Sequence, residues 1–427
     1  MIRTNLHHRL ARTLLIVVEI ATFLVLSLRI GRNFMASRAA EGVGAAELNR
    51  AIELDPGNAE YHLRLARLAL YSVSNASPEL AQEHLMRAAE LSPRNVQVWL
   101  ELSAAHGFQG DPEKAESYLR RADMMAPQIP AIQWVVGNFF LLQGNTDGAF
   151  KHFRMTLSGS HKYDSILFRT AWKSSEDGAK ILDQLIPPRI DTEFGYLYYL
   201  LGEKKLSETS AVWKRIAAGP EKFDAGRVAG YLNRLFDTRK LAEATQVWND
   251  LRNKGLISPA YQPTAQNLII NGNFEEVILN LGFDWRIAKV EGVRAGTDES
   301  TFHSPGRAMK VSFAGKANTS YWHVYQFVRV EPKQKYRLQA FLKIDGITTD
   351  SGPRLRVVDM YDPAKLTKFS ESLTGTTRGW NQVILEFTTG PTTELLTVSL
   401  ARLPSAKLDN MIAGTVWLDD VSLTLLP

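Results

Sequence analysis

Five aromatic side chains in the C-terminal part of the chain have polar side chains nearby in the sequence. Trp and Tyr rings stack on the C–H faces of sugars, while amide and carboxylate groups form paired hydrogen bonds with sugar hydroxyls. Alternation along a strand would place Trp322 and Gln326 on one face and Tyr325 on the other, and one of these faces must be core. The candidates for a binding face are Trp285, Trp322, Tyr325, Tyr361 and Trp380, with Gln326 and Asp359 as polar partners.

The usual catalytic spacings are absent from the sequence. It contains no G-x-S-x-G, H-E-x-x-H, G-x-x-x-x-G-K-[ST] or G-x-G-x-x-G motif, and no cysteine that would act as a nucleophile. We therefore expect a non-enzymatic protein, with a carboxylate pair for glycoside cleavage as a remote alternative. Lys and Arg number 50 against 45 Asp and Glu, without dense basic blocks, so nucleic acid is not an expected partner.

The elements that would position these side chains are short strands. From residue 268 onward, runs rich in Val, Ile, Thr, Tyr and Phe alternate with clusters of Gly, Pro, Asn and Asp, which is typical of an all-β sandwich. The region is long enough for two packed sheets and their core. We predict strands over residues 308–313, 321–330, 335–344, 354–361, 380–388, 395–403 and 414–425.

Two motifs bracket this β region. Residues 267–275 read NLIINGNFE and residues 414–423 read GTVWLDDVSL, while YQFVRVEP at 325–332, followed by YRL, lies between them. These segments resemble the opening strand, closing strand and central hairpin of jelly-roll carbohydrate-binding modules of the galactose-binding-like superfamily. The resemblance implies glycan binding.

The same resemblance implies a structural calcium ion. In the family, an acid of the opening strand and an Asp of the closing strand commonly hold it, which corresponds here to Glu275 and Asp419, with Asp420 as the alternative. Oxygen ligands from the two ends of the domain would tie its termini together. The other interpretation is that these are edge-strand carboxylates that face water.

A repeat precedes the β region. A small residue, a Leu, an Ala and a Pro recur three times with the same spacing, ending at Pro56, Pro93 and Pro127. The last two prolines are 34 residues apart, which is the tetratricopeptide period. Residues 44–156 resemble tetratricopeptide repeats, and degenerate helix pairs follow to about residue 255. The resemblance implies an α-solenoid whose groove binds a protein partner.

One apolar run near the N-terminus is long enough to cross a membrane. It covers residues 11–30, about the length needed to span a hydrocarbon core of roughly 30 Å. Glu19 lies inside it, so we expect this acid to be protonated, close to an interface or paired with another protein.

A cleaved signal peptide is the alternative to an anchor, because Ser37-Arg38-Ala39 has small residues at the usual cleavage offsets. We favour the anchor, because Arg29 and Arg32 lie where signal peptides are usually uncharged. Charge does not decide the orientation, since three arginines flank each end of the run: Arg3, Arg9 and Arg12 before it, and Arg29, Arg32 and Arg38 after it.

The sequence thus predicts a multidomain α plus all-β chain. We expect a tail and transmembrane anchor over residues 1–32, tetratricopeptide-like repeats over 40–254, a linker over 255–266 and a jelly-roll β-sandwich over 267–427. The expected function is a scaffold in a bacterial inner membrane, single-pass, with its soluble part in the periplasm, where polysaccharide is found. It would serve polysaccharide export, assembly or surface attachment. A purely structural protein-interaction adaptor whose β domain binds no sugar is the alternative, and a cryptic glycoside hydrolase comes third.

Overall fold

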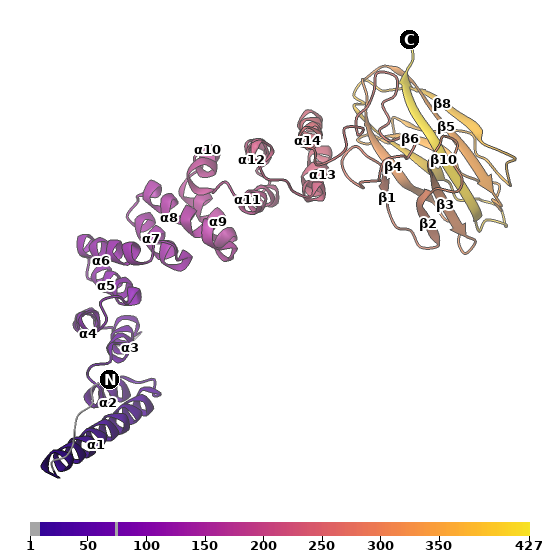
Figure 1. Ribbon diagram of the computed structural model, residues 1–427. Coiled ribbons are helices and arrows are strands. Elements are labelled where there is room, and N and C mark those ends of the chain that lie inside the picture. The colour runs from indigo at the N-terminus through magenta and orange to yellow at the C-terminus, as the bar shows by residue number, and fades with distance from the viewer. Residues whose placement is uncertain (1–8, 73–75) are drawn as a thin grey trace. The chain divides into compact units, whose positions relative to one another are not determined.

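The computed structural model describes residues 9–72 and 76–427, so the start of the predicted tail lies outside the described residues. The chain divides into two compact units, of which the first ends at Tyr196 and the second comprises Leu197–Pro427. Helices fill the first unit and begin the second, and two antiparallel sheets complete the second (Figure 1). This order confirms the predicted fold class of helical repeats followed by an all-β sandwich.

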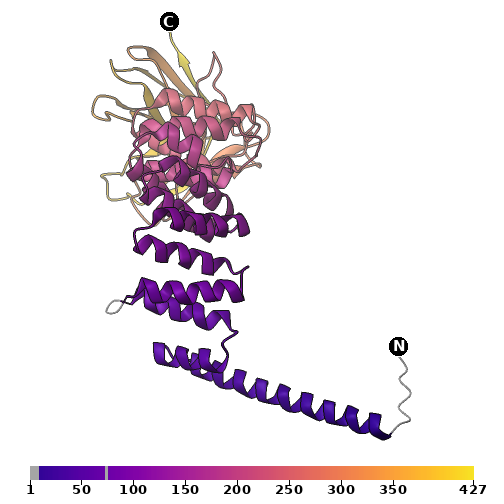
Figure 2. The ribbon, with the colours of Figure 1, turned by 90° about the vertical axis from the view of Figure 1, so that its left-hand side faces the viewer.

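Helices of the first unit pack as successive antiparallel pairs, which Figure 2 shows stacked one above the next. Alanines of the repeated pattern, such as Ala81, Ala88 and Ala122, are fully buried where the helices meet. Their small size lets neighbouring helices approach closely and build one continuous core. The helices are α1 (Arg9–Ala40), α2 (Ala45–Leu54), α3 (Ala59–Tyr71), α4 (Pro78–Leu91), α5 (Val96–Phe108), α6 (Pro112–Met125), α7 (Pro130–Leu142), α8 (Thr146–Gly159), α9 (Asp164–Ser174) and α10 (Gly178–Lys180), with short turns η1 (His161–Tyr163) and η2 (Ile181–Leu185).

Local sequence explains where these helices begin. The Ser77 hydroxyl accepts a hydrogen bond from the amide of Leu80 at 3.4 Å, and Pro78 occupies the first turn of α4. The Asp111 carboxylate accepts a hydrogen bond from the amide of Lys114 at 3.1 Å, and α6 also begins with a proline. A capping oxygen satisfies an otherwise unbonded amide, and proline has no amide to leave unsatisfied.

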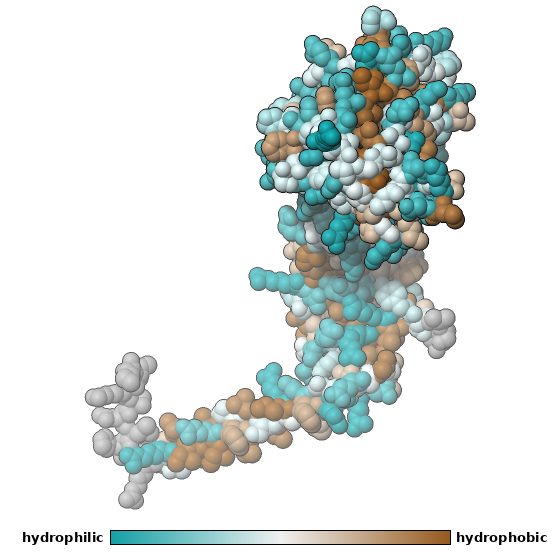
Figure 3. Space-filling model, turned by 90° about the vertical axis from the view of Figure 1, so that its right-hand side faces the viewer, coloured by the Kyte–Doolittle hydropathy of each residue, from teal (hydrophilic) through white to brown (hydrophobic). Residues whose placement is uncertain are grey.

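The two ends of helix α1 have different surroundings. Over residues 11–40 it is long and apolar enough to cross a membrane, and a signal sequence would have the same profile. Its N-terminal part shows an apolar surface in Figure 3. Its C-terminal end is different, because Ala36 and Ala40 are buried in a cluster with Leu48 and Ala51 of α2. The apolar helix therefore continues without a break into the first helix pair.

The second unit begins within α11 (Ile190–Gly202) and adds three further helices before the sheets. These are α12 (Leu206–Ala218), α13 (Ala229–Asp237) and α14 (Leu241–Asn253), with the turn η3 (Ala225–Val228). The segment predicted as a linker contains Tyr261, which is buried and whose carbonyl accepts a hydrogen bond from the Trp248 indole at 2.8 Å. This segment is thus packed against α14.

Ten strands form two five-stranded sheets. Sheet A has the order β1-β4-β9-β6-β7 and sheet B the order β2-β3-β10-β5-β8, with every pairing antiparallel. Apolar side chains of both sheets meet in one core between them. The strands are β1 (Arg286–Ile287), β2 (Val293–Asp298), β3 (Ala308–Ala314), β4 (Tyr321–Arg329), β5 (Lys335–Asp345), β6 (Arg354–Asp359), β7 (Thr367–Phe369), β8 (Asn381–Thr388), β9 (Leu395–Arg402) and β10 (Ala413–Leu425).

The seven predicted strands lie close to their observed ranges, and alternation of buried and less buried residues marks several of them. In β5, for example, every second residue from Tyr336 to Ile344 is buried. No prediction covers β1, β2 and β7, which are short or polar and therefore carry little alternation.

Candidate functional site

Trp285 belongs to the core of the sandwich, which corrects its prediction as a binding residue. Its side chain is fully buried, and its ring centroid lies 5.0 Å from that of Phe274. The indole nitrogen donates a hydrogen bond to the Asn271 carbonyl at 2.9 Å. A buried ring whose only donor is satisfied has no face left for a ligand.

The two predicted polar partners are also internal, and both predictions are corrected. The Gln326 amide bonds to both backbone groups of Ile270, accepting at 2.9 Å and donating at 2.7 Å. Asp359 accepts hydrogen bonds from the Tyr361 amide at 2.8 Å and from the Thr393 hydroxyl at 2.6 Å. Buried polar groups need such partners, so both side chains fasten loops to the sandwich and neither faces solvent.

Tyr361 lies against helix α13, whereas Tyr325 lies on β4 beside Phe327. The Tyr361 hydroxyl donates to the Phe236 carbonyl at 2.7 Å, the Arg239 guanidinium lies 4.5 Å from its ring centroid, and burial raises its pKa to about 12. Tyr361 therefore braces the helix, which corrects its prediction as a ligand contact. Tyr325 is half-buried and meets Phe327 edge to face at 5.5 Å.

Helices α13 and α14 cover one end of the outer face of sheet A. The Phe327 ring lies 5.2 Å from that of Phe236, and the Arg329 guanidinium donates to the Thr245 hydroxyl at 3.3 Å. Both strand residues belong to the last third of β4. Trp322 lies at the other end of β4, and among the described residues its ring contacts are with His323 and Arg356 and not with these helices.

Among the aromatic residues predicted to bind a ligand, Trp322 has a side chain that is exposed to solvent. It is 44% exposed, and the His323 ring stacks beside it with centroids 5.2 Å apart. The pairing of β4 with β9 shifts register between Tyr321 and Val324. Such a bulge interrupts alternation, so Trp322 does not share the buried face of Gln326 as simple alternation predicted. The prediction that Trp322 and Gln326 share one face of the strand is therefore wrong.

Side chains from neighbouring strands complete the surroundings of Trp322. Tyr325, Ser399 and Arg356 lie side by side on β4, β9 and β6. The Arg356 guanidinium lies 5.4 Å from the centroid of the Trp322 ring. Arg354 lies two residues before Arg356 on the same side of β6, where it pairs with Ala401. We call Trp322, His323, Arg354, Arg356 and Ser399 the Trp322 face.

No prediction covers the last four members of the Trp322 face. They come from three strands that are distant in the sequence, and only the register between strands brings them together. A single sequence gives no signal for that register. The bulge in β4, which turns Trp322 outward, is equally invisible to the alternation pattern.

Trp380 lies with a different sheet. Its ring meets that of His303 at 5.7 Å, and His303 in turn stacks on Phe341 of β5 at 3.8 Å. Strand β5 belongs to sheet B, whereas Trp322 is on sheet A. The predicted rings therefore do not form one face, and Trp380 is separate from Trp322.

The predicted calcium ligands make their own hydrogen bonds. Asp419 is buried, and one of its oxygens accepts the amides of His303 at 2.8 Å and Ser304 at 3.1 Å. Burial raises the pKa of Asp419. Asp420 meets the His303 imidazole at 2.5 Å. Asp419 and Asp420 thus hold the loop before β3.

Glu275 supports the same loop. It accepts the Arg307 amide at 3.1 Å, and its carboxylate lies close to Gly306, whose φ of +116° disfavours any residue with a side chain. Within residues 9–72 and 76–427, no group of three or more His, Asp or Glu side chains is arranged to hold a metal ion. Calcium binding by Glu275, Asp419 or Asp420 stays a prediction.

The helical repeats contain an apolar hollow of about 630 Å³. Phe108 of α5 and Leu142 of α7 lie at its edge and are 63% and 85% exposed. Tyr71, Leu100 and Trp134 also line it. Large exposed apolar side chains gathered in one hollow are typical of protein-binding surfaces.

Comparison with known families identifies one repeat directly. Residues 96–129, which comprise α5 and α6, match the family described as tetratricopeptide repeat. This confirms the repeat prediction for that segment. Among curated proteins, none matches the chain.

Solved structures of both predicted kinds are similar to parts of the chain. A carbohydrate-binding module of the CBM4 type is 18% identical with a TM-score of 0.28, over 37% of this chain and 99% of the module. MamA is 15% identical with a TM-score of 0.27, over 44% and 90%. The enzymatically active domain of bacteriophage CBA120 tailspike protein 4 is 17% identical with a TM-score of 0.26, over 38% of this chain. The chain spans 21% of that tailspike structure. At these TM-scores the likenesses carry no conclusion about function.

Proposed function

We propose that this protein is a non-enzymatic, membrane-anchored scaffold whose helical repeats bind a protein and whose β-sandwich binds glycan on the Trp322 face. The observation that carries the glycan proposal is the indole of Trp322, which is exposed on a sheet surface beside a stacked imidazole. An exposed Trp on a flat sheet offers a ring-sized apolar platform, and a sugar ring would cover it.

Helices α13 and α14 limit where a glycan could lie. They cover the Phe327 and Arg329 end of β4 and leave the Trp322 end free. Polar groups border this free end, in particular the guanidinium of Arg356 and the imidazole of His323. Rings beside hydrogen-bonding groups are the chemistry of sugar recognition.

The hollow of the helical repeats supports the protein-binding part of the proposal. Phe108 and Leu142 expose apolar surface there. A partner that inserts apolar side chains would remove this surface from water, which stabilises a complex by about 25 cal/mol per Å² before the costs of association.

The packing of α1 supports an anchor that is retained. A cut at Ser37-Arg38-Ala39 would fall inside α1, and it would separate Ala36 from its buried position beside Leu48. The first helix pair would then lose part of its core. We therefore propose a single-pass protein of a bacterial inner membrane.

We place the soluble part in the periplasm, where a glycan-binding face meets polysaccharide, and we propose a role in polysaccharide export, assembly or surface attachment. A phosphatase fused after Pro427 tests the compartment. Activity of the fusion is expected, and an inactive, cytoplasmic enzyme would contradict the placement.

A glycan array probed with the full-length protein in detergent micelles tests the binding function. We expect binding that Trp322→Ala weakens by about tenfold or more, since stacking and apolar burial of one ring contribute at least 1.4 kcal/mol. Trp380→Ala, which removes a ring from the other sheet, is the control and should keep the affinity. No bound glycan would refute the proposal and leave the structural adaptor.

A further inference from the structure

Two arginines of the Trp322 face lack acidic partners. Arg354 and Arg356 are two residues apart on β6, so their side chains leave the strand on the same side, away from the buried Leu355 and Val357. Among residues 9–72 and 76–427, neither guanidinium forms an ion pair with a carboxylate. Burial lowers the pKa of both groups, and only Glu371 opposes this effect, at Arg354.

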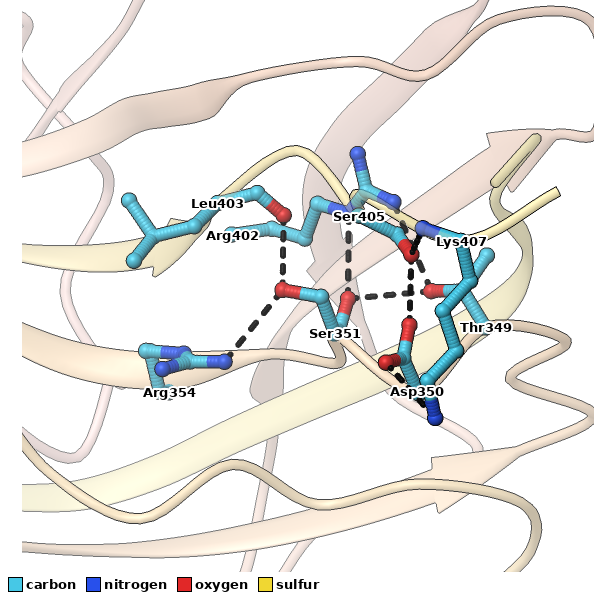
Figure 4. A network of polar contacts seen from close by, with 8 residues as sticks. All are labelled: Thr349, Asp350, Ser351, Arg354, Arg402, Leu403, Ser405 and Lys407. Carbon is cyan, nitrogen blue, oxygen red and sulfur yellow. Dashed lines mark hydrogen bonds and ion pairs between the residues drawn. The ribbon is translucent and has the colours of Figure 1, made fainter. Parts of the chain in front are cut away.

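Two other arginines of the sandwich do form ion pairs with carboxylates. Arg337 approaches Glu386 at 2.7 Å on sheet B, and Arg307 approaches Glu299 at 3.5 Å. Arg354 instead donates to the neutral Ser351 hydroxyl at 3.3 Å, and Figure 4 shows its guanidinium turned toward that group. Positive charge is therefore concentrated on β6, next to Trp322, and among the described residues no carboxylate forms an ion pair with it.

Two polar groups of the Trp322 face also lack hydrogen-bond partners among the described residues. The Ser399 hydroxyl is buried and has no hydrogen-bond partner among the described residues, and neither does Nε of Arg354. Ser399 lies between Tyr325 and Arg356 in the register of the sheet. Buried polar groups without partners are rare and call for a missing acceptor or donor.

We propose that the Trp322 face binds an acidic glycan, with the sugar ring on Trp322 and its anionic substituent between Arg354 and Arg356. This inference rests on the proposed glycan-binding function and adds the ligand class. Guanidinium groups recognise carboxylate and sulfate oxygens through short, paired, charge-assisted hydrogen bonds. The Ser399 hydroxyl supplies a further donor or acceptor on the same row.

The two sources of negative charge, carboxylate and sulfate, are separated by matched probes. The full-length protein in detergent micelles is titrated with a galacturonic acid hexasaccharide and its fully methyl-esterified form, which keeps the ring and removes the charge. The second pair is a sulfated galactan hexasaccharide and its desulfated form. We expect at least one acidic member to bind about tenfold more tightly than its neutral partner, the gain from one well-formed charge-assisted contact.

Variants assign the effect to the two arginines. Arg356→Gln and Arg354→Gln should each remove most of the preference for the acidic member, whereas Arg378→Gln, an exposed arginine in the loop before β8, should retain it. Unchanged circular dichroism and melting temperature of the variants show that each protein still folds. The preference should also decrease as salt concentration rises.

The outcomes separate this inference from the proposed function. Equal affinity for acidic and neutral members, with binding lost in Trp322→Ala, would overturn the acidic specificity and leave glycan binding intact. Absence of binding to all four hexasaccharides and to every glycan of the array would overturn both. A preference that Arg354→Gln and Arg356→Gln leave unchanged would likewise overturn the assignment to these residues.

Discussion

Arg402 is a buried cation whose replacement should strongly destabilise the sandwich. Its side chain is fully buried at the end of β9. The guanidinium donates to the carbonyls of Ser351 at 3.0 Å, Thr319 at 2.8 Å and Asn410 at 3.1 Å, and to the Asn318 side chain at 2.6 Å. A longer contact of 3.4 Å reaches the Thr349 hydroxyl (Figure 4). One side chain thus fastens three loops.

The size of the expected loss in unfolding free energy follows from the hydrogen-bond acceptors that lose their donor when Arg402 is replaced. Arg402→Met fills a similar volume but leaves the carbonyls of Thr319 and Asn410 without the donor they have here. The Ser351 carbonyl keeps the Thr349 hydroxyl and the Asn318 amide oxygen keeps the Ser405 amide. Each stranded buried group costs about 1–3 kcal/mol, partly offset because the methionine needs no desolvation of a charge. Burial already lowers the pKa of Arg402, which reflects that desolvation cost. Two stranded carbonyls, less the desolvation cost that is recovered, give an expected loss of about 2–4 kcal/mol.

Urea unfolding of the full-length protein in detergent micelles measures this loss. Hydrogen exchange of β9 peptides at each urea concentration reports the sandwich separately from the helical repeats. Arg337→Met is the matched control, because its ion pair with Glu386 is solvent-exposed and should cost less than about 1 kcal/mol. If Arg402→Met unfolds at the same urea concentration as the control, the hydrogen bonds of the guanidinium do not stabilise the sandwich by the expected amount.

Two further predictions concern the acids of the sandwich. Burial raises the pKa of Asp284 to about 7, above its unfolded value of 3.8, so its stabilising contribution is complete below the unfolded pKa and is lost as pH rises through 7. The free energy of unfolding should fall by about 2 kcal/mol from pH 5 to pH 8, and Asp284→Asn should flatten this dependence in urea titrations; an equally steep dependence in the variant would contradict the assignment. If Glu275 and Asp419 hold calcium, millimolar Ca²⁺ should raise the melting temperature by several degrees over chelated samples. The rise should disappear in Glu275→Gln, and identical melting with and without Ca²⁺ would disprove the site.

The repeats and strands could be predicted because their signals are local. Buried Ala81, Leu85 and Ala88 recur at helical spacing, and alternation from Tyr336 to Ile344 follows from the pleat of a single strand. Each of these patterns is contained within one element, so the sequence of that element suffices.

The binding face could be predicted only in part because burial depends on distant segments. Trp285 and Trp322 are the same residue type, yet one packs on Phe274 in the core and the other is exposed beyond a bulge. Arg356 and Ser399 become neighbours only through the pairing of β6 with β9. Composition and spacing contain no information on that pairing.

The unbroken course of α1 into the first helix pair has a mechanical consequence. With Ala36 and Ala40 packed against α2, no flexible tether separates the proposed membrane-spanning segment from the first repeats. If α1 spans a bilayer as proposed, any tilt of α1 in that bilayer is passed directly to the first helix pair. A force on these repeats would in turn be transmitted through α1 to the bilayer.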